Sequence, residues 1–358
     1  MILKKLDRFI IKKFLGTFVF MLFLLMSISM VFDLSEKLNE FIANGAPWDE
    51  IFLIYYTNFF LYYGVQFSYL LNFISVIWFT SKMAGNTEIV PILSSGVGFK
   101  RFLRPYFISS SILVLVTILM YNFVLPVSNK ARIEFEETYY RVKVNKSNFR
   151  LQVTDNQMLY FYNYNASTNR IKRFTLETWQ DHRLVNSFTS EIAYGDTLSK
   201  NWTFENCEIR KLGAFNDEVR YYENFDTTLN FGIKDLIFRP NIIESMDYKE
   251  LNNFIKEQEL KGSDDVPKFL LEKHKRWASP FAIFILTLIG VSVSSKKSRG
   301  GLGINLAIGF GICFLYIFSM QITTVAALNM GFTPFLAVWT PNIIFSFIAY
   351  FLYLKAPK

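Results

Sequence analysis

The sequence has few residues of the kinds that bind metals or cross-link a fold. It contains two cysteines and two histidines in 358 residues. Cys207 lies in the polar middle of the chain and Cys313 lies in a long apolar run, so a disulfide framework is excluded. His182 and His274 have no cysteine or second histidine at ligand spacing. We therefore expect neither a metal site nor a cofactor.

Motifs for nucleotide binding and hydrolysis are also missing. The pattern G-x-x-x-x-G-K-[ST] does not occur, and the nearest stretch, 96–100, has the wrong spacing. H-E-x-x-H, C-x-x-C and G-x-S-x-G are absent as well. Gly309 and Gly311 form a lone G-x-G inside an apolar run, which is typical of helix packing. The chain is therefore not predicted to be an enzyme, and nucleotide energy would have to come from a partner subunit.

Charge is absent from six long apolar runs. Each is long enough to cross a hydrocarbon core of about 30 Å at about 1.5 Å per residue, and lipid requires such a segment to be helical. The runs are Phe14–Phe32, Ile51–Phe79, Pro105–Val127, Trp277–Ser295, Leu302–Met330 and Phe332–Leu354. Their lack of acidic and basic residues argues against a proton- or ion-coupled transporter. We predict an α-helical membrane protein with six transmembrane helices, arranged 3+3 around one insert.

The flanking charges predict the orientation. Basic residues far outnumber acidic ones in segments 4–13, 82–104, 296–299 and 355–358, whereas the loop 33–50 is acidic. By the positive-inside rule, both termini are cytoplasmic and the insert lies on the far side of the membrane. The net charge of +8 then belongs to the cytoplasmic face, which argues against nucleic-acid binding.

The insert changes pattern along its length. It begins with a helical stretch at 128–141 that continues the third span, and short alternating segments follow from Asn148. Seven or so such segments predict a β-sandwich, barrel or jelly roll. Their alternate apolar residues would line either a packed core or an acyl-chain groove. We expect three regions: residues 1–127, the insert with flanking helices at 128–270, and residues 271–358.

The loop between the second and third spans predicts a short cytoplasmic helix at about 87–96. Thr87 is the expected N-cap and Gly96 the expected stop. An acid and an apolar face suit docking into a groove of an ATPase subunit, and an interfacial helix lying on lipid headgroups is the alternative. The side chains concerned are Glu88, Ile89, Ile92 and Leu93.

Four stretches resemble a known family. They are Leu6–Ile10 (LDRFI), Glu88–Gly96 (EIVPILSSG), Lys275–Phe281 (KRWASPF) and Leu288–Val291 (LIGV). With the 3+3 layout, they look like the LptF/LptG permeases of the lipopolysaccharide exporter. The opening Leu-Asp-Arg-aromatic leans toward the LptG side. The resemblance covers essentially the whole chain, although the β insert matches mainly in topology.

The resemblance implies a permease subunit of an ATP-driven ABC transporter in the bacterial inner membrane. Such a subunit extracts lipopolysaccharide and passes it to a periplasmic bridge of β-jelly rolls, of which the insert is one. The implied partners are a second LptF/LptG-type permease, a dimeric cytoplasmic LptB-like ATPase, a bitopic LptC-like protein and a periplasmic LptA-like jelly roll. The alternatives are a permease-like subunit of another lipid or lipoprotein ABC exporter, and a periplasm-facing lipid-modifying enzyme.

The resemblance also implies residue roles. The loop with Glu88, Ile89, Ile92, Leu93 and Gly96 matches the family's coupling helix. Family members bind lipid A phosphates near the periplasmic ends of spans one and three, where this chain has Lys37, Lys130 and Arg132. Ordinary snorkelling is the alternative for each base. A further rim cluster, His274, Lys275 and Arg276, would anchor the fourth span and link it to the β domain, or contact a headgroup.

Overall fold

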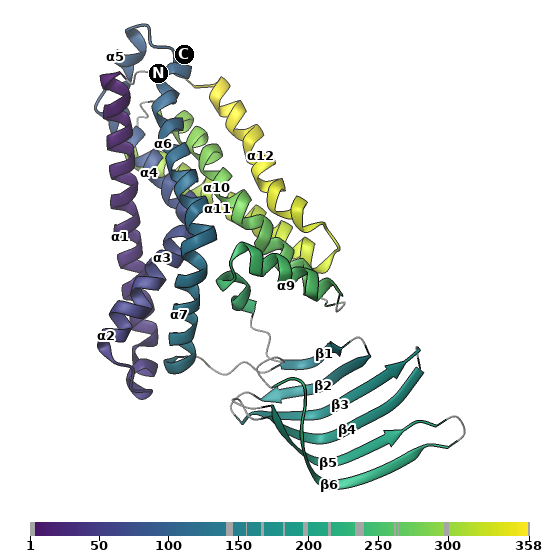
Figure 1. Ribbon diagram of the computed structural model, residues 1–358. Helices are drawn as coiled ribbons and strands as arrows, with labels where there is room; N and C mark the ends of the chain where they lie inside the picture. The colour runs from purple at the N-terminus through teal and green to yellow at the C-terminus, as the bar shows by residue number, and fades with distance from the viewer. Residues whose placement is uncertain are drawn as a thin grey trace. The chain divides into compact units, whose positions relative to one another are not determined.

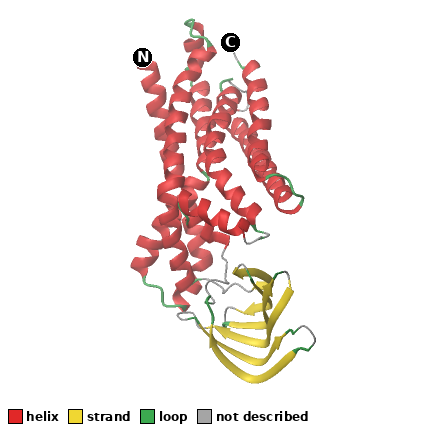
Figure 2. Cartoon of the chain, turned by 45° about the vertical axis from the view of Figure 1, so that its right-hand side comes forward, coloured by secondary structure: helices red, strands yellow, loops and turns green. Residues whose placement is uncertain are grey.

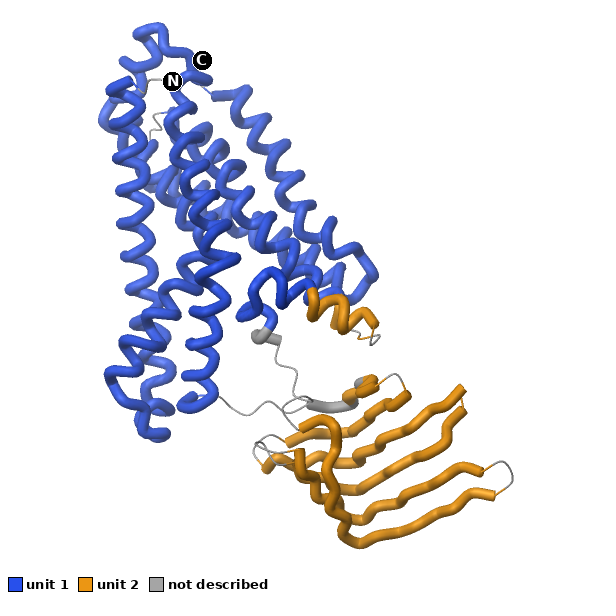
Figure 3. The backbone as a smooth tube through the Cα atoms, in the orientation of Figure 1, with its two compact units in different colours: residues 1–140, 243–252, 267–358 blue, residues 141–242, 253–266 orange. Residues whose placement is uncertain are grey.

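The structure, a computed structural model, describes residues 4–140, 146–154, 156–165, 168–181, 183–195, 200–213, 216–232, 240–260, 263, 265–296 and 301–356. The chain forms two compact units (Figure 3). The helical unit comprises residues 1–140, 243–252 and 267–358, and the β unit comprises 141–242 and 253–266. Residues 128–140, which we assigned to the insert, therefore pack with the helical unit, because they continue the helix of the third span. His182 lies outside the described residues.

The helices are named in chain order (Figures 1 and 2). They are α1 (Lys5–Ala43), α2 (Trp48–Glu50), the π-helix η1 (Ile51–Tyr56), α3 (Thr57–Gln66), α4 (Ser68–Gly85), α5 (Ile89–Ser94), α6 (Phe99–Leu119), the π-helix η2 (Met120–Val124), α7 (Leu125–Tyr139), the 3-10 helix η3 (Pro240–Ser245), α9 (Tyr248–Leu260), α10 (Val266–Ser294), α11 (Gly301–Asn329) and α12 (Pro334–Leu354).

Within the described residues, five helices are long and apolar enough to cross a membrane. The predicted count of six holds if the bent pair formed by 48–66 and α4 is taken as one span. The third span runs unbroken from Phe99 to Tyr139, as the helical pattern of residues 128–141 predicted. These helices confirm a multi-pass membrane protein, and the number of crossings depends on the bent pair.

The second span is broken where we expected one straight helix. Its two halves meet at a bend of 70°, and Phe67 lies between them. The amides of Leu70 and Leu71 both donate to the carbonyl of Phe67 at 3.0 Å, so the helical ladder restarts there. The break contains no proline, and Gly64 and Ser68 flank it, a combination that weakens a helix locally.

α4 is the centre of the helical unit. One face packs with α1, α5, α6 and α10, and another packs with α10, α11 and α12. Polar contacts join the same helices, because Asn72 donates to the Thr287 hydroxyl at 2.9 Å and Ser110 donates to the same oxygen at 2.9 Å. Hydrogen bonds between helices are a common link in membrane bundles. In Figure 1, α5 and both chain ends lie at one end of this unit, and α2 and the end of α7 lie at the other.

We predict that Gly290→Ala destabilises the helical unit by about 1–3 kcal/mol through overpacking. A Cβ on Gly290 would lie 2.9 Å from Val76 Cγ1 and 3.3 Å from the Phe73 ring. Gly311→Ala is the matched control, because its Cβ meets nothing within 4 Å. Thermal unfolding in detergent measures both, and equal melting temperatures for the two variants would contradict the packing argument.

The β unit contains a six-stranded antiparallel sheet whose strands pair in chain order. The strands are β1 (Lys146–Thr154), β2 (Gln157–Asn165), β3 (Arg170–Gln180), β4 (Arg183–Gly195), β5 (Asn201–Lys211) and β6 (Glu218–Thr228). The last two predicted segments cover residues 218–225 and 227–233. Strand β6 contains the whole of the first segment and the beginning of the second, and it ends at Thr228. One sheet face forms a packed core around Phe174, Trp202 and Phe204, and Trp202 Nε1 donates to the Phe231 carbonyl at 3.0 Å. This burial favours the packed-core interpretation of the alternating residues.

A transverse row of residues interrupts the pairing in all six strands; we call it the crease. Its members lie between paired neighbours and are Asn148, Tyr162, Arg173, Glu191, Asn206 and Glu223. Alternation reverses there, because Ile171 and Phe174 are both buried on β3 and Phe204 and Cys207 are both buried on β5. Arg173 and Asn206 each have φ of 52°, in the left-handed region. The register of each strand pair is the same on both sides of the crease, so the row is a shared irregularity without an inserted residue.

Candidate functional site

A cluster of four charged residues lies buried where α1 and α7 meet; we call it the charge cluster. Asp33 and Lys37 are one turn apart on α1, and Arg132 and Glu136 are one turn apart on α7. Lys37 Nζ lies 2.7 Å from Asp33 Oδ1 and 3.9 Å from Glu136 Oε1. Arg132 Nη1 donates to the same Glu136 oxygen. The four side chains are 5–13% exposed, so the two cations and two carboxylates neutralise each other inside the protein.

Tyrosines from the second span surround this cluster. Lys37 Nζ donates a hydrogen bond to the Tyr55 hydroxyl, and the Arg132 guanidinium lies 4.7 Å from the centroid of the Tyr62 ring. The Tyr55 hydroxyl donates to Asp33 Oδ2 at 3.0 Å. A cation over an aromatic face is attracted by the ring quadrupole, most strongly where water is excluded. Tyr55 of the π-helix η1 and Tyr62 of α3 therefore hold the cations of α1 and α7 in place.

Two of the three predicted phosphate-binding bases, Lys37 and Arg132, form ion pairs inside the protein. The structure brings Lys37 and Arg132 together, because both contact Glu136, but neither offers a bare positive charge. Arg132 also donates through Nε and Nη2 to the Asn129 side chain, at 3.2 and 2.8 Å. Lys130 is exposed on the other side of α7. Phosphate binding by Lys37 and Arg132 stays a prediction, and the structure adds that both bases are paired with carboxylates that the sequence reasoning overlooked.

The three residues of the predicted rim cluster at the start of the fourth span, His274, Lys275 and Arg276, also differ in their burial and contacts. Arg276 is 1% exposed and donates to the carbonyls of Met246 and Ile243, at 2.8 and 2.9 Å. Its Nε also lies 3.3 Å from Glu272 Oε1. The His274 ring meets Phe335 edge-on at 5.4 Å, and Lys275 is half-buried. Arg276 therefore connects the returning end of the insert, at Ile243 and Met246, to α10.

The same returning segment also contacts the second span. The Tyr62 hydroxyl donates to the Glu244 carboxylate, directly after the residue whose carbonyl Arg276 holds. Tyr62 therefore touches both the charge cluster, through Arg132, and the segment that leads back from the insert. These contacts connect the charge cluster on α1 and α7 with α10 through one tyrosine.

The predicted coupling helix is shorter than expected. α5 covers Ile89–Ser94, with Glu88 as its N-cap residue. Thr87 is not the cap, because its φ of 58° places it in the preceding turn. Gly96 has φ of +84°, the left-handed conformation that suits the predicted helix stop. Pro91 occupies the third helical position, where its missing N–H breaks no helical hydrogen bond.

The two faces of α5 have different roles. Ile89 is 1% exposed within the core that α5 shares with α1, α4 and α6, and Ile92 and Leu93 pack against this core. Val90 is 60% exposed, and Pro91 and Ser94 are also exposed. Glu88 is half-buried and accepts a hydrogen bond from Asn86 Nδ2 at 3.0 Å. Of the residues predicted to face a partner, Glu88 is therefore accessible, whereas Ile89 serves to fix the helix on the bundle.

An ion pair holds the base of this loop. Arg101 Nη1 and Nη2 each donate to one oxygen of Asp7 at 2.7 Å. The Asp7 carboxylate is 1% exposed and also accepts the backbone N–H of Lys4 at 3.0 Å. Such a bidentate pair joins the start of α1 to the start of α6, directly after the α5 loop. A force applied to α5 would therefore reach both spans.

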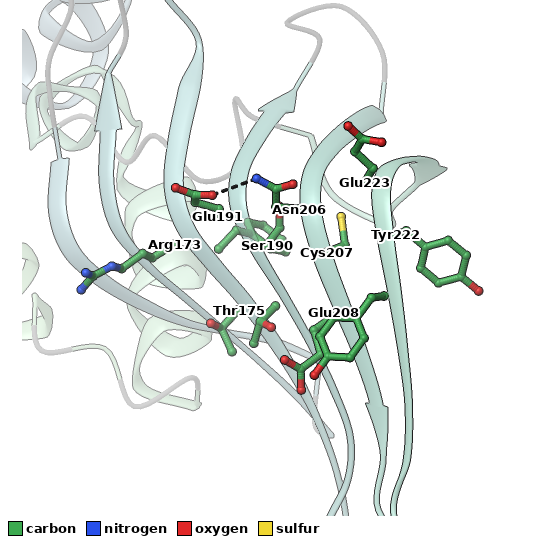
Figure 4. Close-up of a pocket in the computed structure, with 12 residues that line it drawn as sticks. Arg173, Thr175, Ser190, Glu191, Asn206, Cys207, Glu208, Tyr222 and Glu223 are labelled. Carbon is green, nitrogen blue, oxygen red and sulfur yellow. Dashed lines mark hydrogen bonds between the residues drawn. The ribbon is translucent and has the colours of Figure 1, made fainter.

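The β unit has a cleft of about 660 Å³ along the crease (Figure 4). Its lining carries three carboxylates and the base Arg173, and Asn206 Nδ2 donates to Glu191 Oε2 at 2.9 Å. An acidic cleft does not suit a phosphate. Burial raises the pKa of the Cys207 thiol above its usual range, which favours the unreactive thiol form. Among the described residues, no group of histidines, cysteines and carboxylates could hold a metal ion.

Sequence reasoning overlooked the acids of the charge cluster and Glu244. The helical spacing of Asp33 with Lys37, and of Arg132 with Glu136, was available as a signal for ion pairs within one helix. The contacts across helices had no signal of that kind, because Lys37 and Glu136 lie far apart in the chain.

Comparison with known protein families gives a match over nearly the whole chain. The sequence matches the model of the family described as lipopolysaccharide export system permease LptF/LptG, over residues 8–355. The comparison with curated proteins gave no match. The family match spans nearly the whole chain, including the membrane helices, the β insert and the α5 loop. The chain therefore belongs to the LptF/LptG family of lipopolysaccharide export permeases.

Proposed function

We propose that this chain is the permease subunit of an ATP-driven complex that extracts lipopolysaccharide from the inner membrane and passes it to a periplasmic β bridge. The observation that carries the proposal is the family match over residues 8–355. The chain's helices, which are long and apolar enough to cross a membrane, and its inserted antiparallel sheet support this function. Transport energy comes from a cytoplasmic ATPase dimer, and a second permease of the same family completes the cavity.

The proposed orientation places α5 and both termini in the cytoplasm. These parts lie together at one end of the helical unit (Figure 1), and this end carries the basic flanking segments. The charge cluster and the β unit are then periplasmic, where the β unit receives lipid in the manner of a jelly-roll bridge. An LptC-like bitopic protein and an LptA-like jelly roll extend that bridge.

The ATPase is proposed to contact the outer face of α5. Glu88, Val90 and Pro91 form this face, while Ile89, Ile92 and Leu93 connect the helix to the cores of the spans. An exposed apolar patch beside a carboxylate suits a groove with a basic rim. Movement of that groove during ATP hydrolysis would reach α1 and α6 through the Asp7–Arg101 pair.

Lipid A phosphates are proposed to bind at the periplasmic ends of α1 and α7. Lys37 and Arg132 are the bases of this region, and Lys130 adds an exposed charge on α7. The acyl chains would lie along the apolar surface of the bundle. The buried tyrosines of η1 and α3 make the phosphate end of the site rigid.

Co-purification tests this proposal. An affinity-tagged chain extracted from membranes in mild detergent is expected to retain a related permease, two copies of a P-loop ATPase and bound lipopolysaccharide. Mass spectrometry identifies the proteins, and lipid extraction identifies the ligand. A chain that purifies alone, with catalytic turnover of its own on a lipid, would contradict the transporter subunit and favour the enzyme alternative.

A further inference from the structure

The charge cluster contains more charge than a structural contact needs. Burying ions in a medium of low polarity is costly, and replacing a buried ion pair by apolar residues of similar volume is often neutral or stabilising. Here two cations and two carboxylates are all at most 13% exposed, at a place where three spans meet. Apolar residues would join these helices at least as well. The arrangement therefore suggests a function for the charges themselves.

The individual contacts differ in strength. Within α1, Lys37 Nζ lies 2.7 Å from Asp33, whereas its contact with Glu136 on α7 measures 3.9 Å. The Glu136 oxygen that Lys37 faces is the one already bound by Arg132. Glu136 is thus the shared carboxylate, and its link to Lys37 is the longer of the two ion pairs that Lys37 forms.

Carboxylates and phosphates are alternative partners for the same bases. A guanidinium binds either group through the same planar arrangement of N–H donors, and a lysine binds either as a point charge. A phosphate monoester carries more negative charge than a carboxylate near neutral pH. It can therefore displace a carboxylate from a shared pair of bases, whereas a lipid without phosphate cannot.

We propose that Glu136, assisted by Asp33, occupies the place of a lipid headgroup phosphate in the empty permease. When the phosphate arrives, it takes Arg132 and Lys37, and the released Glu136 turns to water at the membrane edge. The exchange breaks the Lys37–Glu136 contact between α1 and α7. Release of the lipid restores that contact, so the carboxylate also helps to expel the headgroup. This inference rests on the proposed function, because it assigns a regulator to the proposed phosphate site.

The exchange is tested in detergent by lipid binding to the purified complex that the full-length chain forms with its second permease and the ATPase. The probes are lipid A with both phosphates and the same lipid after enzymatic dephosphorylation, titrated by native mass spectrometry. Glu136→Gln keeps the size of the side chain and removes its charge. It is expected to tighten binding of phosphorylated lipid A about tenfold, the equivalent of one charge-assisted hydrogen bond, and to leave the dephosphorylated lipid unaffected. Asp33→Asn acts on Lys37 and is expected to change binding in the same direction.

Glu134→Gln is the matched control, because Glu134 is exposed on the same helix. A folded Glu136→Gln variant that binds phosphorylated lipid A no more tightly than wild type would overturn the exchange while leaving the proposed function intact. If Glu136→Gln does not fold, Asp33→Asn decides, and unchanged or weaker binding by that variant overturns the exchange as well. Failure of wild type to bind either lipid would contradict the proposed function itself. Equal tightening by Glu134→Gln would show a general effect of surface charge and would also overturn the exchange.

Discussion

Reversing the charge at Glu88 is expected to stop lipopolysaccharide export while the protein still inserts into the membrane. Glu88 begins α5 and is accessible beside the exposed Val90. A lysine there would repel the basic rim expected on the ATPase groove, and a repulsive charge at an interface costs several kcal/mol. We expect Glu88→Lys to weaken ATPase association at least about tenfold, which pull-down of the ATPase with the tagged permease measures.

Two controls make the Glu88 experiment specific. Glu36→Lys reverses an exposed acid near the other end of α1 and should leave ATPase association unchanged. Val90→Asp, which alters the exposed apolar face, should weaken association as Glu88→Lys does. Ile89 is unsuitable as a probe, because it is 1% exposed and its replacement would disturb the bundle core. Normal export by cells that carry Glu88→Lys would show that α5 is not the coupling element.

Arg276→Met is expected to lower the free energy of unfolding of the helical unit by about 3–5 kcal/mol, the usual effect of removing one partner of a buried ion pair. Arg276 is 1% exposed and holds two backbone carbonyls besides Glu272. Methionine fills similar space but donates no hydrogen bond, so the carbonyls of Ile243 and Met246 lose their donors. Glu272 loses its hydrogen-bonded counter-charge and keeps only the charge of Lys275 nearby. Thermal unfolding of the purified protein in detergent measures the effect.

Lys275→Met is the matched control for this loss of charge. Lys275 is the adjacent residue and is half-buried, so its replacement should change stability by less than about 1 kcal/mol. The double variant Arg276→Met/Glu272→Gln should recover part of the loss, because it removes the buried acid that has lost its hydrogen-bonded partner. Equal destabilisation by Arg276→Met and Lys275→Met would refute the anchoring role of Arg276.

The membrane layout could be predicted because it depends on local composition. Runs without charge predict helices wherever they occur, and alternation from Asn148 onward predicts strands regardless of what they pack against. The bend at Phe67 was not predictable in the same way, because glycine and serine weaken a helix but also occur in helices that stay straight. A break there depends on how α3 and α4 pack separately with their neighbours.

The candidate site was predicted less well than the fold. Position along the chain identified Lys37 and Arg132 as bases at a membrane edge, but it did not show that both bases form ion pairs with Asp33 and Glu136. The apolar residues of α5 illustrate the same limit, since an amphipathic pattern does not tell whether the apolar face meets the protein's own core or a partner. Burial of Ile89 settles that question only once the neighbouring spans are in place.

The crease has a consequence for how the β unit can change during evolution. The strands β2, β3, β4 and β5 each bury two residues three positions apart across this row, so the reversal in one strand matches those in its neighbours. Loss of one residue, such as Asn206, would leave Phe204 and Cys207 on the same face but shift part of β5 by one residue in register against β4 and β6. A single insertion or deletion at this row therefore requires a matching change in the neighbouring strands.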